Sequence, residues 1–199
     1  MTIFQIIVLL SWVTFLIYWV LNWRKVKPTK EKQFDIAKFR GVALVIILLA
    51  VLIIRYFHLA NPCQITWSGC HFNAYESSNF IIFDYLGDIF GVLGILIAII
   101  ARRTLSTNWS STVELKKGHE LITSGIYSYI RHPIYAGMMF IMLGTVLVFP
   151  TILEVIILIL VYVTFIFRMI KEEELMGKTF SKEYSQYKKK TKMLIPFIF

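Results

Sequence analysis

The sequence predicts an all-α integral membrane protein with about five transmembrane helices. Of its 199 residues, 57% are hydrophobic and 16% are aromatic, and the mean hydropathy is +0.68, well outside the range of soluble domains. Only 17% of the residues are charged, yet 21 Lys and Arg outnumber 12 Asp and Glu, giving a net charge of +9. Charges avoid hydrocarbon, so the basic residues must lie in the few segments that reach water. The composition excludes disordered, collagen-like and coiled-coil chains.

Five apolar stretches predict the membrane spans, since a helix needs about 20 mostly apolar residues to cross the hydrocarbon core. They cover residues 3–21, 41–57, 80–101, 134–149 and 151–170. Pro150 separates the last two stretches and leaves room only for a tight turn, which predicts an antiparallel helical hairpin. The first stretch lacks the charged start and the small-residue cleavage site of a signal peptide, so we expect the protein to retain it.

The distribution of Lys and Arg predicts the orientation, because short basic loops stay on the cytoplasmic side of a membrane. Residues 22–40, 102–131 and 171–199 together hold 19 of the 21 basic residues. Residues 58–80 and the turn at Pro150 hold none. We therefore expect the N-terminus outside and the C-terminus in the cytoplasm. An odd number of crossings requires the same separation of the two ends.

Both cysteines, Cys63 and Cys70, lie in the segment expected outside. Two cysteines are too few for a disulfide framework or a four-ligand zinc site. They form one local bridge at most, and the bridged and free states both remain open.

The third predicted span carries residues whose spacing indicates contacts with other helices. Asp84 and Asp88 lie one turn apart near its outer end. They are the expected partners of Arg55 in the second span, because ionisable groups inside a membrane are usually paired. Gly87 and Gly91 form a small-xxx-small pattern, which is typical of close helix packing.

Three water-facing segments are long enough to form a pocket. The first, residues 22–40, is basic, contains Pro28, and has the character of a connector held at the membrane surface by anionic head groups. No catalytic arrangement is evident in it. The second, residues 102–133, is long for a connector, and long ordered loops tend to be functional. Within it, residues 112–115 and 120–122 can present extended backbone, which suits the edge of a purine ring.

The second segment ends at Arg131, His132 and Pro133, with Pro133 in the first turn of the next helix, where its missing N–H costs nothing. A helix N-terminus offers free N–H groups and partial positive charge, so His132 and the following amides are expected to bind an anion such as a carboxylate. Tyr127 and Tyr135 can offer ring faces to a cation. The alternative for His132 is a helix-capping residue that contacts only lipid head groups.

The third segment continues the last span into the C-terminal tail. Arg168 and Glu172 are four residues apart on one helix, so they share a face and can pair. Such a pair either belongs to a site or is only a simple salt bridge at the membrane interface. The number of carboxylates here exceeds what one Arg can pair with, since three acidic residues are consecutive: Glu172, Glu173 and Glu174. Lysines 188–190 and 192 are most simply explained as charges at the membrane surface.

Several short motifs occur in one order across residues 108–199. They are Gly118-His119-x-Leu121, Gly125-x-Tyr127, Arg131-His132-Pro133-x-Tyr135-x-Gly137, Glu172-Glu173, Phe180, Glu183-Tyr184-x-x-Tyr187 and Ile195-Pro196. Their joint spacing resembles the isoprenylcysteine carboxyl methyltransferase family of integral membrane enzymes. Ser181 stands where that family usually has Gly. Met138, Met139 and Phe140 stand where aromatic residues and Gln are frequent.

The resemblance implies a division of the chain. Residues 1–107 would form three transmembrane helices with the connector 22–40. Residues 108–199 would form the catalytic region, made of a cofactor loop at 108–133, the helical hairpin at 134–170 and the C-terminal segment at 171–199.

The resemblance also implies a methyltransferase that uses S-adenosyl-L-methionine. The implied cofactor-binding residues are His119, Glu120, Leu121, Ile122, Tyr127, His132, Pro133, Ile134, Tyr135 and Glu172. Arg168 is the implied catalytic residue and binds the carboxylate of a lipophilic, prenylcysteine-like acceptor. Membrane lipids are the other expected partner, and neither nucleic acid nor a metal is expected.

Methyl transfer to a carboxylate needs no strong base, because the carboxylate is already ionised near neutral pH. Alignment of the reacting atoms and exclusion of water are then the tasks of the protein. Two alternatives remain open: a methyltransferase acting on a lipid amine or a small thiol, and a non-catalytic membrane scaffold with interfacial anchors.

Overall fold

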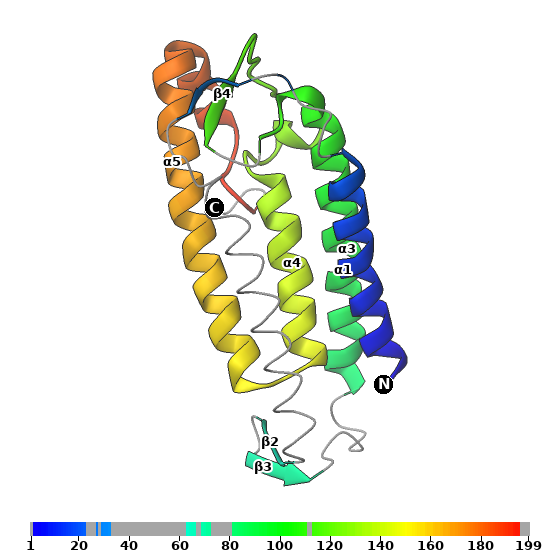
Figure 1. Cartoon of the computed structure of the whole chain (residues 1–199). Coiled ribbons are helices and arrows are strands. Elements are labelled where there is room, and N and C mark those ends of the chain that lie inside the picture. The colour runs from blue at the N-terminus through cyan, green and yellow to red at the C-terminus, as the bar shows by residue number, and fades with distance from the viewer. Residues whose placement is uncertain are drawn as a thin grey trace.

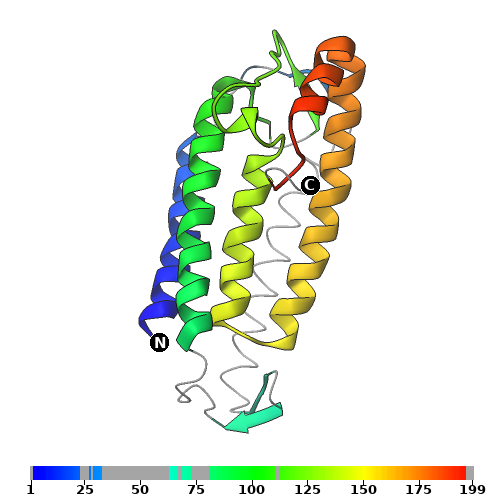
Figure 2. The same cartoon turned by 180° about the vertical axis from the view of Figure 1, so that it is seen from behind.

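The computed structural model describes residues 2–22, 27, 29–32, 63–66, 69–72, 81–110 and 113–195. Within these residues the long helices α1, α3, α4 and α5 run side by side (Figure 1, and from behind in Figure 2). They span Ile3–Asn22, Ile81–Leu105, Pro133–Val148 and Ile152–Lys190, and short 3₁₀ helices cover Ser106–Asn108 and Gly125–Ser128. The architecture is thus predominantly helical.

Two short antiparallel strand pairs lie at opposite ends of the helices (Figure 1). At one end β1 (Thr29–Lys32) pairs with β4 (Glu114–Lys116), and at the other β2 (Cys63–Thr66) pairs with β3 (Gly69–Phe72). In the second pair, Cys63 is opposite Phe72 and Cys70 is opposite Ile65. The cysteine side chains lie outside the described residues, so the predicted bridge stays open.

Two helices in the described part of the chain are long and apolar enough to cross a membrane, Ile3–Asn22 and Ile81–Asn108. They match the predicted spans 3–21 and 80–101. The apolar helix α4 is shorter, and α5 continues 20 residues beyond the predicted span 151–170. The predicted span 41–57 and Arg55 lie outside the described residues, so five crossings and the pairing of Arg55 with Asp84 and Asp88 stay predictions.

The connection between α4 and α5 follows from Pro150. Helix α4 ends where the Phe149 N–H donates to Thr145 O at 2.8 Å. Helix α5 begins when the Thr151 side chain accepts a hydrogen bond from the Glu154 N–H at 3.3 Å, a standard N-cap. The two helices lie antiparallel across this turn (Figure 1), in the arrangement that the sequence predicts.

Helices α3 and α4 approach each other along a stripe of glycines. A Cβ atom on Gly94 would lie 2.5 Å from Gly137 O, and one on Gly87 would lie 2.9 Å from Gly144 O. A Cβ on Gly91 would instead contact Ser11 of α1 at 3.4 Å. The predicted close packing of Gly87 and Gly91 is therefore confirmed, with one glycine toward α4 and the other toward α1.

The end of α5 turns back toward the start of α4. The turn occurs at Ser181, whose φ of 26° and ψ of −91° are non-helical, in a region that favours glycine. Beyond it, the Arg131 N–H donates to Lys192 O at 2.8 Å and the His132 N–H donates to Met193 O at 3.1 Å. The C-terminal segment thus lies beside the residues that precede α4.

Candidate functional site

A cavity of about 350 Å³ lies where α3, α4 and α5 meet the loop after α3 and the C-terminal segment. Most of the residues implied by the family resemblance are in its wall. His119, Glu120, Leu121, Ile122, Tyr127, His132, Ile134, Tyr135, Arg168 and Glu172 all line it. Pro133 is fully buried at the first turn of α4. The fold thus brings together residues from three segments that are up to 53 positions apart.

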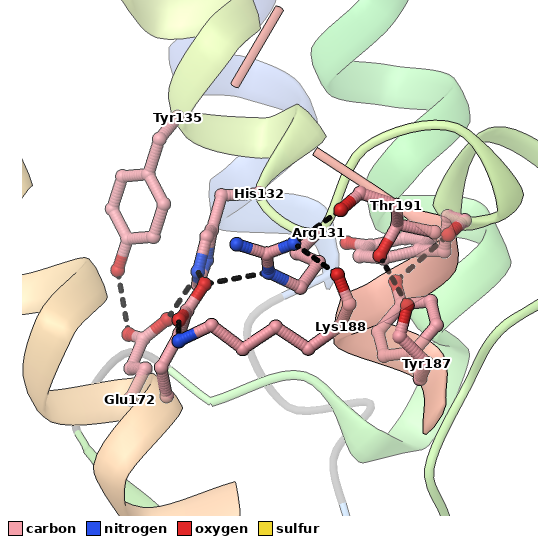
Figure 3. A network of polar contacts seen from close by, with 9 residues as sticks. Arg131, His132, Tyr135, Glu172, Tyr187, Lys188 and Thr191 are labelled. Atoms are coloured by element: carbon pink, nitrogen blue, oxygen red, sulfur yellow. Dashed lines mark hydrogen bonds and ion pairs between the residues drawn. The ribbon is translucent and has the colours of Figure 1, made fainter. Parts of the chain in front are cut away.

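Tyr135, Arg168 and Glu172 form the polar centre of the cavity, and Figure 3 shows Tyr135 pointing toward Glu172. The Tyr135 hydroxyl donates to Glu172 Oε1 at 2.6 Å, and Arg168 Nε donates to the same oxygen at 3.1 Å. The Arg168 guanidinium carbon also lies 5.7 Å from the centre of the Tyr135 ring, within the range of a cation–π interaction. The pairing of Arg168 with Glu172, predicted from their spacing, is confirmed. Apolar side chains such as Phe165 surround this group.

His132 lies between two carboxylates. Its Nδ1 is 3.7 Å from Glu172 Oε2 and its Nε2 is 3.5 Å from Glu173 Oε1. The side chain is 8% exposed and makes no capping hydrogen bond, although His132 occupies the N-cap position of α4. This buried environment does not fit the alternative of a capping residue that contacts only lipid head groups.

Glu173 holds a second group of charges behind the cavity. Its Oε1 accepts a hydrogen bond from Arg131 Nε at 2.6 Å, and Lys188 Nζ is 2.6 Å from its Oε2. Arg131 also donates to Thr191 O at 2.5 Å, as Figure 3 shows. Burial opposes ionisation of Glu173, but hydrogen bonds from His132, Lys188 and Arg131 outweigh it and lower the pKa to about 2. The Lys188 side chain is nevertheless 54% exposed, so its interpretation as a membrane-surface charge stays a prediction.

Buried tyrosines join the C-terminal segment to the loop. Tyr187 donates to Tyr127 O at 2.8 Å, and the Thr191 hydroxyl donates to Tyr187 O at 2.8 Å. Burial raises the pKa of Tyr187 to about 12 and raises that of Tyr127 well above its ordinary value. Both phenols are therefore neutral hydrogen-bonding groups at physiological pH.

Sequence reasoning missed several residues of the cavity wall. Phe15 and Trp19 come from α1, and Asn108 and Trp109 precede the motifs. Arg102 fixes this region, since it donates to Asn22 O at 3.1 Å and to Ser106 O at 2.6 Å. Aromatic residues in an apolar span do not indicate a site, but Asn108 lies at the start of the region 108–199 that carries the motifs and was a candidate by position.

Comparison with known proteins shows which family the chain is similar to. Residues 88–178 match the sequence model of the isoprenylcysteine carboxyl methyltransferase (ICMT) family. The family resemblance is confirmed. The protein-S-isoprenylcysteine O-methyltransferase of Saccharomyces cerevisiae is 37% identical over 116 residues, which are 57% of this chain and 48% of that protein. The Rattus norvegicus protein of the same name is 33% identical over 110 residues, covering 54% of this chain and 39% of the relative.

A solved structure of the eukaryotic intramembrane Ras methyltransferase ICMT also resembles this chain. The TM-score is 0.50 at 27% sequence identity, over 60% of this chain and 48% of that one. The chain therefore spans about half the length of these relatives, or less. The match to the family includes the loop, α4 and most of α5, but it leaves out α1 and the connector that follows it.

Proposed function

We propose that this protein transfers the methyl group of S-adenosyl-L-methionine to the carboxylate of a lipophilic, prenylcysteine-like acceptor. The observation that carries the proposal is the cavity at the end of the helices, where Arg168, Glu172 and Tyr135 meet the loop 119–127. Tyr135 and Glu172 belong to the motifs that resemble the family, Arg168 lies within the residues matched to the family model, and the named relatives are protein-S-isoprenylcysteine O-methyltransferases.

The residues of the cavity fit the cofactor. Glu172, with a side chain that is 25% exposed, gives a carboxylate for a cationic centre, and Tyr127 and Tyr135 add ring faces. The first amides of α4 follow Pro133 and have no partner within the helix, so they suit an anion such as a carboxylate. The backbone of residues 119–122 is assigned to the adenosine.

The cofactor, when bound, supplies an electrophilic methyl group on a sulfonium, which a carboxylate oxygen displaces in line. Arg168 would hold the acceptor carboxylate, because its planar guanidinium can bind two oxygens and keeps its charge. Its side chain is 29% exposed, and Glu172 and Tyr135 fix its position. Apolar neighbours such as Phe165 would keep water from the reacting atoms.

We also propose that the cavity faces the cytoplasm. Lys27, which contacts Asn108 of the cavity wall, and the lysine-rich end of α5 lie at the same end of the helices as the cavity. Strands β2 and β3, which belong to the segment 58–80 without Lys or Arg, lie at the opposite end (Figure 1). This distribution supports the positive-inside prediction. A C-terminal tag should then be labelled only after intact cells are made permeable, and labelling from outside would overturn the orientation.

The function is tested in two steps on detergent-purified protein. Calorimetric titration with S-adenosyl-L-methionine should show binding, whereas a non-catalytic scaffold would show none. A panel of acceptors with radiolabelled cofactor then compares a prenylcysteine acid with a lipid amine and a small thiol. Methyl transfer to the acid alone is expected, and transfer to the amine or thiol instead would replace the proposed acceptor.

A further inference from the structure

The connector after α1 contacts the rim of the cavity. The Lys27 N–H donates to Thr107 O at 2.9 Å. Further along, β1 pairs antiparallel with β4, with Thr29 opposite Lys116, Lys32 opposite Glu114 and a register shift between Thr29 and Glu31. These are backbone bonds, so they fix the position of residue 27 whatever its side chain. Lys27 and β1, which belong to a connector interpreted from the sequence as a membrane-surface segment, therefore also lie at the rim of the site.

The Lys27 ammonium joins three parts of the cavity loop. Its Nζ lies 3.1 Å from Asn108 Oδ1, 2.7 Å from Gly118 O and 3.3 Å from Glu120 Oε1. The Glu120 side chain is 71% exposed, and exposed ion pairs contribute little. Asn108 is buried at 7% exposure, so its bond to Lys27 has the larger structural consequence.

The contacts of Asn108 determine which way its side-chain amide points. Its Oδ1 accepts hydrogen bonds from Lys27 Nζ and from the Glu120 N–H, the latter at 3.4 Å. An ammonium and a backbone N–H can only donate, so the atom that faces them must be the oxygen. The Nδ2 group, with two donors and no acceptor, is then what Asn108 offers to the cavity that it lines.

We propose that Asn108 Nδ2 donates a hydrogen bond to an acceptor atom in the adenosine part of the cofactor, and that Lys27 is a positioning residue that holds the amide in this orientation. The inference rests on the proposed function. It is supported by the shared contact with Glu120, because Glu120 belongs to the segment assigned to the adenosine and its N–H binds the same Oδ1. Lys27 thereby links a segment outside the family match to cofactor binding.

The decisive variant is Asn108→Asp. Asp has the same shape and accepts from both Lys27 and the Glu120 N–H, but its carboxylate has no donor for the cofactor. We expect the affinity for S-adenosyl-L-methionine, measured by calorimetric titration, to fall about tenfold or more. The melting temperature of the ligand-free variant should stay at or above that of the wild type. If Asn108 had only a structural role, Asn108→Asp would bind the cofactor like the wild type.

Lys27 is tested with Lys27→Met, which keeps the apolar stem and the backbone bonds. The affinity should fall because the amide is then free to turn. The double variant Lys27→Met/Asn108→Ala should bind no more weakly than Asn108→Ala alone, since Lys27 acts through Asn108. The matched control is Lys117→Met, at an exposed lysine in the turn after β4, which should leave the affinity within about twofold of wild type.

The outcomes separate this inference from the proposed function. Wild-type protein that binds no S-adenosyl-L-methionine would overturn both. Wild-type binding with an unchanged affinity in Asn108→Asp would overturn the inference alone. If the losses of cofactor affinity multiply in the double variant, Lys27 acts independently of Asn108, and its proposed positioning role is wrong.

Discussion

Replacement of Glu173 by Gln is expected to destabilise the protein by about 3 kcal/mol at neutral pH. The Glu173 side chain is 9% exposed, and Arg131, which is 8% exposed, lies 2.6 Å from one of its oxygens. Gln keeps the size but removes the charge, so Arg131 is left buried without its carboxylate. Loss of one partner of a buried ion pair costs about 3–5 kcal/mol.

The lowered pKa of Glu173 gives a similar value for the loss of stability. Burial raises it, but hydrogen bonds from His132, Lys188 and Arg131 lower it further, from 4.5 to about 2, and each pH unit between these values corresponds to about 1.4 kcal/mol. A carboxyl group whose pKa is lower in the folded chain stabilises the fold above its unfolded pKa. The stabilisation is therefore complete above pH 4.5 and is lost as the pH falls through about 2.

Thermal unfolding in detergent measures this effect, and Glu174→Gln is the matched control. Glu174 is the next residue, and it pairs at the surface with Lys171 and Lys178, where ion pairs contribute little. At pH 7 we expect Glu173→Gln to melt roughly 6–12 °C below wild type and Glu174→Gln to melt close to it. The difference in melting temperature between Glu173→Gln and the wild type should become smaller below pH 4.5. Equal melting temperatures for the two variants at pH 7 would refute the reasoning.

Three further predictions follow from the fold and the site. Ser181→Gly should stabilise the protein by roughly 1 kcal/mol, because Ser181 has a φ of 26° that costs glycine little; a melting temperature at or below wild type would contradict this. Gly94→Ala should destabilise by about 1–3 kcal/mol, since its Cβ would lie 2.5 Å from Gly137 O, whereas Gly91→Ala, at 3.4 Å from Ser11, should be tolerated in the same unfolding assay. Arg168→Lys should lose turnover with cofactor affinity nearly intact, because Lys lacks the planar fork, while Glu172→Gln should lose cofactor affinity. Equal loss of stability with normal turnover in both would indicate a structural salt bridge only.

Local sequence patterns were sufficient for α1, for α3, for the end of α4 and for one contact of the site. Apolar length alone predicts α1 and α3, because the hydropathy of a span does not depend on its neighbours. Pro150 predicts the end of α4, since proline breaks a helix wherever the chain goes next. The spacing of Arg168 and Glu172 predicts their ion pair, because residues four apart share a face of any helix.

The tertiary structure alone decided which distant segments meet. Lys27 contacts Asn108 across 81 positions, and Arg131 contacts Glu173 across 42. From the sequence, Lys27 and Lys188 could be interpreted only as charges that reach water. Helical periodicity predicts which residues share a face of one helix, but it does not predict which residues of another segment that face contacts. The turn at Ser181 brings Lys188 back to Glu173, and the β1–β4 pairing brings the connector over the loop. Charges that the sequence places at the surface find these partners only through this long-range packing.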